Sequence, residues 1–165
     1  MKNIQVAIGL AIKNEPDYSR CFSGKIEMLA RNIQKLTGFE AILIQSMDYC
    51  PAQYIAIKLK NHINPSLKTG FEVRFYVSSK ASLFFVYIID EAGRIKNHRG
   101  NSHPLPLGVL SQAAQDVIVK ISNFLVENSY QEVTYEYYDK EAIDCLTQMD
   151  GLPASIFEAL FAEIV

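Results

Sequence analysis

The chain has 165 residues, of which 49% are hydrophobic and 21% are charged, so it can bury the core of one folded domain. This composition excludes an intrinsically disordered chain, a collagen-like fibre and a small domain that depends on disulfides. The formal charge is −2, from 16 Lys and Arg against 18 Asp and Glu, so no overall basic field indicates a nucleic-acid-binding protein. We expect a single domain over residues 1–165.

The cysteines and the N-terminus indicate the cellular compartment. Cys21, Cys50 and Cys145 are odd in number and lack C-x-x-C spacing, which favours thiols in a reducing cytosol. The apolar run 4–12 is short for a signal peptide, no A-x-A cleavage site follows it, and no run has the length of a transmembrane helix. We therefore predict a cytoplasmic protein without a membrane partner.

The N-terminal part holds one ambiguous segment and one clear helix. In residues 4–12 apolar side chains occupy every second position, which favours a strand, although the small residues between them also permit a helix. Residues 19–37 are predicted to form a helix, because apolar side chains recur on one stripe and Gly38 is a natural residue to end it.

Four strand-like segments follow, separated by breaks short enough for hairpins. They cover residues 40–46, 53–60, 71–78 and 83–89, and a short extra strand is expected around 94–96. The segment 83–89 is apolar on both faces, which is typical of a central strand that is covered on both sides. Consecutive strands with short breaks predict an antiparallel meander.

The C-terminal third is predicted to be helical. A helix is expected over 107–127, and two shorter ones over 139–148 and 153–163, with Asp139 as an N-cap and Pro153 in a first turn. The predicted fold is therefore α+β: an antiparallel meander sheet of four to five strands, packed by an N-terminal helix and two to three C-terminal helices.

The near-zero total charge hides a division along the sequence. Residues 1–100 carry 14 Lys and Arg against 8 Asp and Glu, whereas residues 101–165 carry 2 Lys against 10 Asp and Glu. Such asymmetry is a hint about partners, because an acidic surface attracts a basic one. The alternative is that the opposite charges attract each other within the fold or remain solvated.

The acidic third contains a segment, residues 130–141, that interleaves four tyrosines with four carboxylates, and Glu127, Asp144 and Asp150 extend the negative charge on either side. Tyrosine is enriched at the centre of protein interfaces, and surrounding carboxylates speed association with a basic partner. The alternation over 133–138 is also typical of an amphipathic edge strand, in which some tyrosines would belong to the core. The candidate partner-binding residues are Glu132, Tyr135, Glu136, Tyr137, Tyr138, Asp139, Glu141 and Asp144.

In chemical character, this segment resembles the acidic, tyrosine-bearing faces with which nuclease-toxin immunity proteins block basic toxins. The resemblance implies a non-catalytic inhibitor that occludes the active site of a basic enzyme, with carboxylates in place of the phosphates that the enzyme expects. It implies no particular fold. On this interpretation, Tyr137→Ala or Glu136→Lys weakens binding at least tenfold and leaves the fold intact.

A basic loop over residues 93–104 offers an alternative site. Two histidines with Lys and Arg can bind a phosphate or cleave RNA by acid–base chemistry, so the competing function is a nucleic-acid-binding domain or a hydrolase. The candidate residues of this loop are Arg94, Lys96, His98, Arg99 and His103. His98 and His103 lack zinc-site spacing, and the chain has no glycine-rich phosphate loop, so no metal or cofactor is predicted. A third class is a structural subunit or secretion chaperone that binds protein in an apolar groove.

Overall fold

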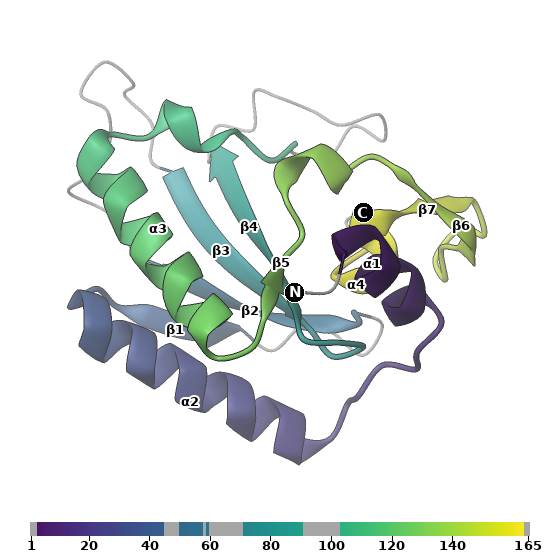
Figure 1. The fold of residues 1–165 in the computed structure, drawn as a ribbon, viewed down its shortest axis with the longest axis horizontal. Coiled ribbons are helices and arrows are strands. Elements are labelled where there is room, and N and C mark those ends of the chain that lie inside the picture. Colours follow the sequence, from purple (N-terminus) through teal and green to yellow (C-terminus); the bar gives the residue numbers. More distant parts are fainter. Residues whose placement is uncertain (1–2, 45–49, 58, 60–70, 91–102, 164–165) are drawn as a thin grey trace.

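The computed structural model describes residues 3–44, 50–57, 59, 71–90 and 103–163, and it confirms the predicted α+β class (Figure 1). Five strands form one sheet in the order β1-β2-β3-β4-β5, and two more form a small separate sheet. The strands are β1 (Ala41–Ile44), β2 (Ala52–Ile57), β3 (Phe71–Ser78), β4 (Leu83–Asp90), β5 (Gln131–Glu132), β6 (Glu141–Leu146) and β7 (Pro153–Ser155). The strand expected around 94–96 lies outside the described residues.

The N-terminal segment is a helix, α1 (Ile4–Ile12), so the preference for a strand was wrong. Asn3 caps this helix, since its side chain accepts a hydrogen bond from the backbone two residues on. When apolar residues occupy every second position, some of them are four positions apart, and residues four apart lie on the same side of a helix. Ile8 on that side is buried. Val6 and Leu10 point elsewhere and remain exposed.

The long helix predicted over 19–37 is confirmed as α2 (Arg20–Thr37). The Ser19 hydroxyl accepts a hydrogen bond from the backbone N–H of Phe22 at 3.2 Å, which satisfies a free donor of the first turn. Gly38 ends the helix at φ 73°, a left-handed conformation that costs glycine no strain.

The sheet is mixed rather than a purely antiparallel meander. Strands β1 to β4 pair antiparallel in sequence order, as predicted. The helix α3 (Gln112–Glu127) then carries the chain back, and β5 lies parallel to β4 with Gln131 opposite Leu83. A connection as long as a helix permits parallel pairing, which a hairpin does not. The helix expected over 107–127 starts five residues later than predicted, at Gln112, because Ser111 is its N-cap. The residues before it, Leu107–Val109, form a 3₁₀ turn, η1.

Helices cover both faces of the sheet (Figure 1). On one face, α2 and α3 pack their apolar stripes against alternate residues of β2 to β4. On the other face lie α1, the β6–β7 hairpin and α4 (Ile156–Leu160). Phe157 of α4 centres this second core, where its ring centroid lies 5.0 Å from those of Phe85 and Tyr138. Strand β4 is therefore covered on both sides, as its apolar sequence predicted.

The two short C-terminal helices were predicted wrongly in part. Residues 139–148 form β6 instead of a helix: the carbonyl of Lys140 accepts from the backbone N–H of Ile156 at 2.7 Å, and Asp144 has a left-handed φ of 57° that interrupts helical geometry. Over 153–163 the chain first forms β7, and α4 begins only after Ser155. Within the residues described above, no helix combines the length and apolar character needed to cross a bilayer.

Candidate functional site

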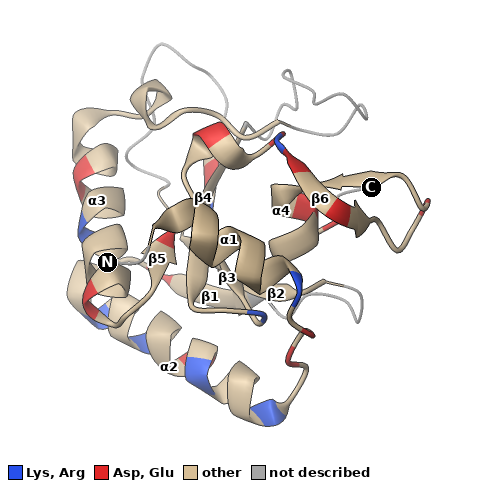
Figure 2. Ribbon diagram, turned by 45° about the vertical axis from the view of Figure 1, so that its right-hand side comes forward, with Lys and Arg blue, Asp and Glu red and all other residues tan. Residues whose placement is uncertain are grey.

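Four exposed carboxylates follow one another along η2 (Tyr135–Tyr137), the turn after it and β6 (Figure 2). We call them the acidic surface, and they are Glu136, Asp139, Glu141 and Asp144. Lys140, which is also exposed, lies between them in the sequence. Its ammonium group lies 4.4 Å from the centre of the Tyr137 ring. The acidic surface therefore keeps a net negative charge that is open to solvent.

The tyrosines of the segment divide into one surface residue and two core residues. Tyr135 is 46% exposed, whereas Tyr137 is 8% and Tyr138 is 5% exposed. Tyr137 and Tyr138 therefore belong to the second core, so we now expect Tyr137→Ala to destabilise the fold as well as to affect binding. The edge strand considered for 133–138 is also replaced by the 3₁₀ turn η2. Tyr135 remains the candidate aromatic anchor of the acidic surface.

Tyr138 holds the acidic segment onto the sheet. Its ring centroid lies 5.9 Å from that of Tyr87 on β4, and the two side chains are hydrogen-bonded. Burial, followed by the interaction with Tyr138, raises the pKa of Tyr87 far above the ordinary range. The Tyr87 phenol is therefore neutral and serves as a structural hydrogen-bonding group.

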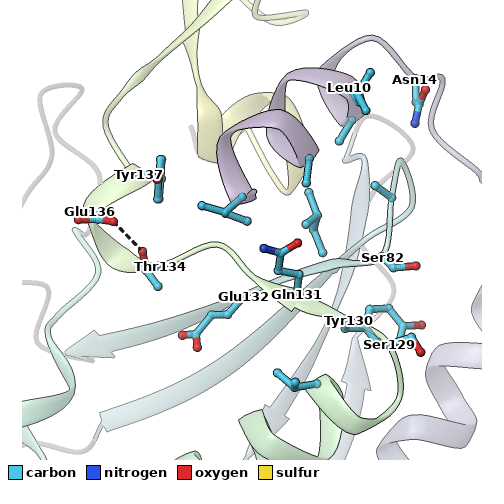
Figure 3. A pocket seen from close by; sticks show the side chains of 16 residues that line it. Leu10, Asn14, Ser82, Ser129, Tyr130, Gln131, Glu132, Thr134, Glu136 and Tyr137 are labelled. Atoms are coloured by element: carbon cyan, nitrogen blue, oxygen red, sulfur yellow. Dashed lines mark hydrogen bonds between the residues drawn. The ribbon is translucent and has the colours of Figure 1, made fainter. Parts of the chain in front are cut away.

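Glu132 is set apart from the other carboxylates because it is half-buried on β5. Burial raises the pKa of its carboxyl group, since the charged form is poorly solvated there. Successive side chains of a strand point to opposite faces, and Figure 3 shows Gln131 pointing toward α1 and Glu132 pointing away from it. Glu132 thereby contributes to a small pocket of about 240 Å³ on the α3 side of the sheet.

Two larger grooves flank α1. The first, of about 890 Å³, lies between α1 and the segment β5–η2 (Figure 3). In it, the Thr134 hydroxyl donates a hydrogen bond to Glu136 at 3.4 Å. The second, of about 680 Å³, lies between α1 and β6, and we call it the α1–β6 groove. The α1–β6 groove has apolar walls that include Val6, Leu10 and Ile143.

The α1–β6 groove joins apolar and acidic groups. Val6 and Leu10 of α1 are each 55% exposed, and Ile143 of β6 is 79% exposed. Glu141 and Asp144 of the acidic surface line the same groove, and so do Lys13 and Lys140. Exposed apolar side chains rimmed by charges are typical of a protein-interaction site. Sequence analysis missed these apolar residues, because it assigned α1 to a strand and β6 to a helix.

One residue of the alternative basic site touches the acidic surface. The Nε2 atom of His103 lies 3.0 Å from an Asp139 carboxylate oxygen, and its Nδ1 lies 2.8 Å from the Pro104 carbonyl oxygen. The histidine ring also packs edge-on against Tyr138, with centroids 4.9 Å apart. His103 is thus engaged in structural contacts. The other candidates of that loop, Arg94, Lys96, His98 and Arg99, lie outside the described residues.

The charge division of the sequence is only partly a division in space, since Lys13 lines the α1–β6 groove and the acidic Asp116 and Glu127 lie on α3 beside α2. The Lys and Arg positions of α2 lie at one end of the molecule, away from β6 (Figure 2). The ion pairs that the structure describes, Arg31–Glu27, Arg74–Glu72 and His103–Asp139, each join two residues of the same half of the chain. Glu136, Glu141 and Asp144 take part in none of these ion pairs.

Within the part of the chain that the structure describes, no three His, Cys, Asp or Glu side chains are grouped to hold a metal ion. Comparisons of the chain with protein-family models, with curated proteins and with solved structures give no match. What the chain does therefore has to be inferred from the chemistry of the acidic surface and the grooves beside it.

Proposed function

We propose that this chain is a non-catalytic protein-binding module, an immunity-type inhibitor that neutralises a basic enzyme such as a nuclease by covering its active site. The observation that carries the proposal is the meeting of acidic and apolar groups at the α1–β6 groove. There Glu141 and Asp144 border exposed aliphatic side chains, with Lys13 and Lys140 on the same rim.

The two kinds of group have separate roles in such a complex. Exposed carboxylates attract a basic surface over a distance of about 10 Å at moderate salt, which raises the association rate. Apolar side chains such as Ile143 then lose contact with water on docking, which slows dissociation. A basic active site that binds phosphates would be blocked sterically and neutralised electrostatically.

The rigid attachment of the acidic surface favours binding of an enzyme rather than a flexible peptide. Glu136 lies between Tyr135 and Tyr137, and the buried Tyr137 fixes the turn η2 against the second core. Carboxylates on a fixed turn lose little conformational freedom on binding, which favours affinity.

Affinity capture from a lysate of the source cells tests the proposal. The bait is the wild type beside the double variant Glu136→Lys/Glu141→Lys. A matched control, Glu15→Lys/Glu40→Lys, makes the same charge change at two exposed sites outside the acidic surface. We expect the wild type and the control to retain one basic protein, and the surface variant to lose it with at least a tenfold drop in affinity.

The identity and behaviour of the captured protein then decide the function. A basic enzyme whose activity falls on complex formation supports the inhibitor proposal. A partner that binds both variants equally, or an acidic partner, contradicts the assignment of the surface. Retention of nucleic acid that dissociates steeply with salt would instead favour the basic loop.

A further inference from the structure

The small pocket beside Glu132 has the composition of a binding site for a basic side chain. It lies between β4, β5, η1 and α3 and has a volume of about 240 Å³, many times the ~30 Å³ share of one water molecule. Its walls are mainly aliphatic, from Val86 and Ile88 of β4, Leu105, Leu107 and Ile118. We call it the Glu132 pocket.

Among the residues that the structure describes, Glu132 is the one charged residue that lines this pocket. Its side chain forms no hydrogen bond or ion pair with any other residue in the part of the chain that the structure describes. Burial alone raises its pKa, so no cation of the described residues compensates its charge. A half-buried carboxylate without a partner is costly unless a cation supplies the missing charge and hydrogen bonds.

The remaining polar groups stand around the pocket. Tyr135 lines it together with Ser122 and Asn123 of α3. An exposed tyrosine ring attracts a cation that lies over its face, and guanidinium groups use this contact more often than ammonium groups. Guanidinium is also weakly hydrated and binds a carboxylate through two parallel hydrogen bonds. Aliphatic walls suit the three methylene groups of an arginine stem.

We propose that the Glu132 pocket receives an arginine side chain of the partner protein, with its guanidinium on the Glu132 carboxylate and its stem along the aliphatic walls. This inference rests on the proposed function, because the arginine belongs to the partner protein proposed there. The exposed carboxylates would attract that partner, and the arginine would anchor it. Glu132 thus acts at short range, whereas the acidic surface acts at long range.

A small ligand tests the pocket without the partner. The probe is acetyl-arginine methylamide, titrated into ¹⁵N-labelled full-length protein and followed by NMR. Acetyl-citrulline methylamide, which has the same shape without the charge, is the control ligand. We expect saturable shifts at Glu132, Val133 and Tyr135 with a Kd on the order of 1 mM for arginine, and at least tenfold weaker binding of citrulline.

Two protein variants complete the test. Glu132→Gln keeps the shape of the side chain and removes its charge, and we expect it to weaken arginine binding at least tenfold. Glu40→Gln makes the same change at an exposed site outside both the pocket and the acidic surface, and it is expected to leave the affinity for the small probe unchanged. The NMR spectrum of each variant also shows directly that it is folded.

The outcomes separate this inference from the proposed function. No saturable shift, equal shifts with citrulline, or unchanged binding to Glu132→Gln overturns the arginine pocket, whatever the capture experiment gives. Arginine binding that depends on Glu132, together with a captured protein that binds the acidic-surface variant as well as the wild type, upholds the pocket and overturns the inhibitor proposal.

Discussion

His103 and Asp139 lie 36 positions apart in the sequence, yet the Nε2 atom of the histidine lies 3.0 Å from the aspartate carboxylate. The same ring packs against Tyr138, so the segment before α3 is attached to the turn that presents the acidic surface. Pro104 offers a carbonyl acceptor to the other ring nitrogen.

The first prediction concerns this attachment. His103→Ala removes a hydrogen bond to a carboxylate and the ring contacts with Tyr135 and Tyr138, and it should lower the free energy of unfolding by about 2 kcal/mol. Asp139→Asn leaves the rings in place and affects a half-exposed group, so it should cost less than about 1 kcal/mol. Urea denaturation of both variants checks this, and a His103→Ala protein as stable as the wild type would contradict the structural role.

A second prediction separates the two classes of tyrosine. Tyr137→Ala opens a cavity in the second core and should cost about 3 kcal/mol, whereas Tyr135→Ala on the surface should cost about 1 kcal/mol or less. Thermal unfolding of the two variants side by side measures the difference. Equal losses would show that the burial of Tyr137 has no energetic consequence.

The sequence predicted the elements that are stabilised by their own periodicity. Helix α2, the strands β3 and β4 and most of α3 each carry a strong local pattern, and each was found close to its expected position. The strand prediction for residues 4–12 was wrong because alternating apolar residues can also line the buried side of a helix.

Non-local pairing explains the failure at the C-terminus. Strand β6 buries few side chains and is held by its pairing with β7, which no pattern within 139–148 reveals. For α4, the S-x-x-E pattern of Ser155 and Glu158 was a capping signal that would have placed its start correctly. The acidic residues of the site were found from composition, but the exposure of each tyrosine depends on tertiary packing.

The third prediction tests the capping of α4. The Ser155 hydroxyl accepts from the backbone N–H of Glu158 at 3.2 Å, and the Glu158 carboxylate accepts from the N–H of Ser155 at 2.8 Å. Ser155→Ala should therefore cost about 1–2 kcal/mol, because a buried backbone donor loses its partner. Chemical denaturation measures this loss, and Ser155→Thr, which keeps the hydroxyl, should recover part of it. A full loss in both variants would argue against the cap.

A fourth prediction follows from the raised pKa of Glu132. The folded state holds this proton more tightly than the unfolded state, so wild-type stability is complete below the unfolded pKa and falls as the pH rises through the folded pKa. The Glu132→Gln variant has no carboxyl group at this position, so it does not lose stability in this way as the pH rises. Relative to the wild type, the variant should gain stability as the pH rises from 3 to 7, as measured by melting temperature across that range. A pH-independent difference would contradict the burial of an uncompensated carboxylate.

The central claim is that the acidic surface binds a basic enzyme and blocks it. The most direct measurement is a titration of the captured partner's activity with increasing amounts of the wild type, the acidic-surface variant Glu136→Lys/Glu141→Lys and the control variant Glu15→Lys/Glu40→Lys. We predict stoichiometric inhibition by the wild type and by the control, and at least a tenfold higher concentration of the surface variant for the same effect. Full activity of the partner in the presence of saturating wild type, or equal inhibition by both variants, would contradict the account.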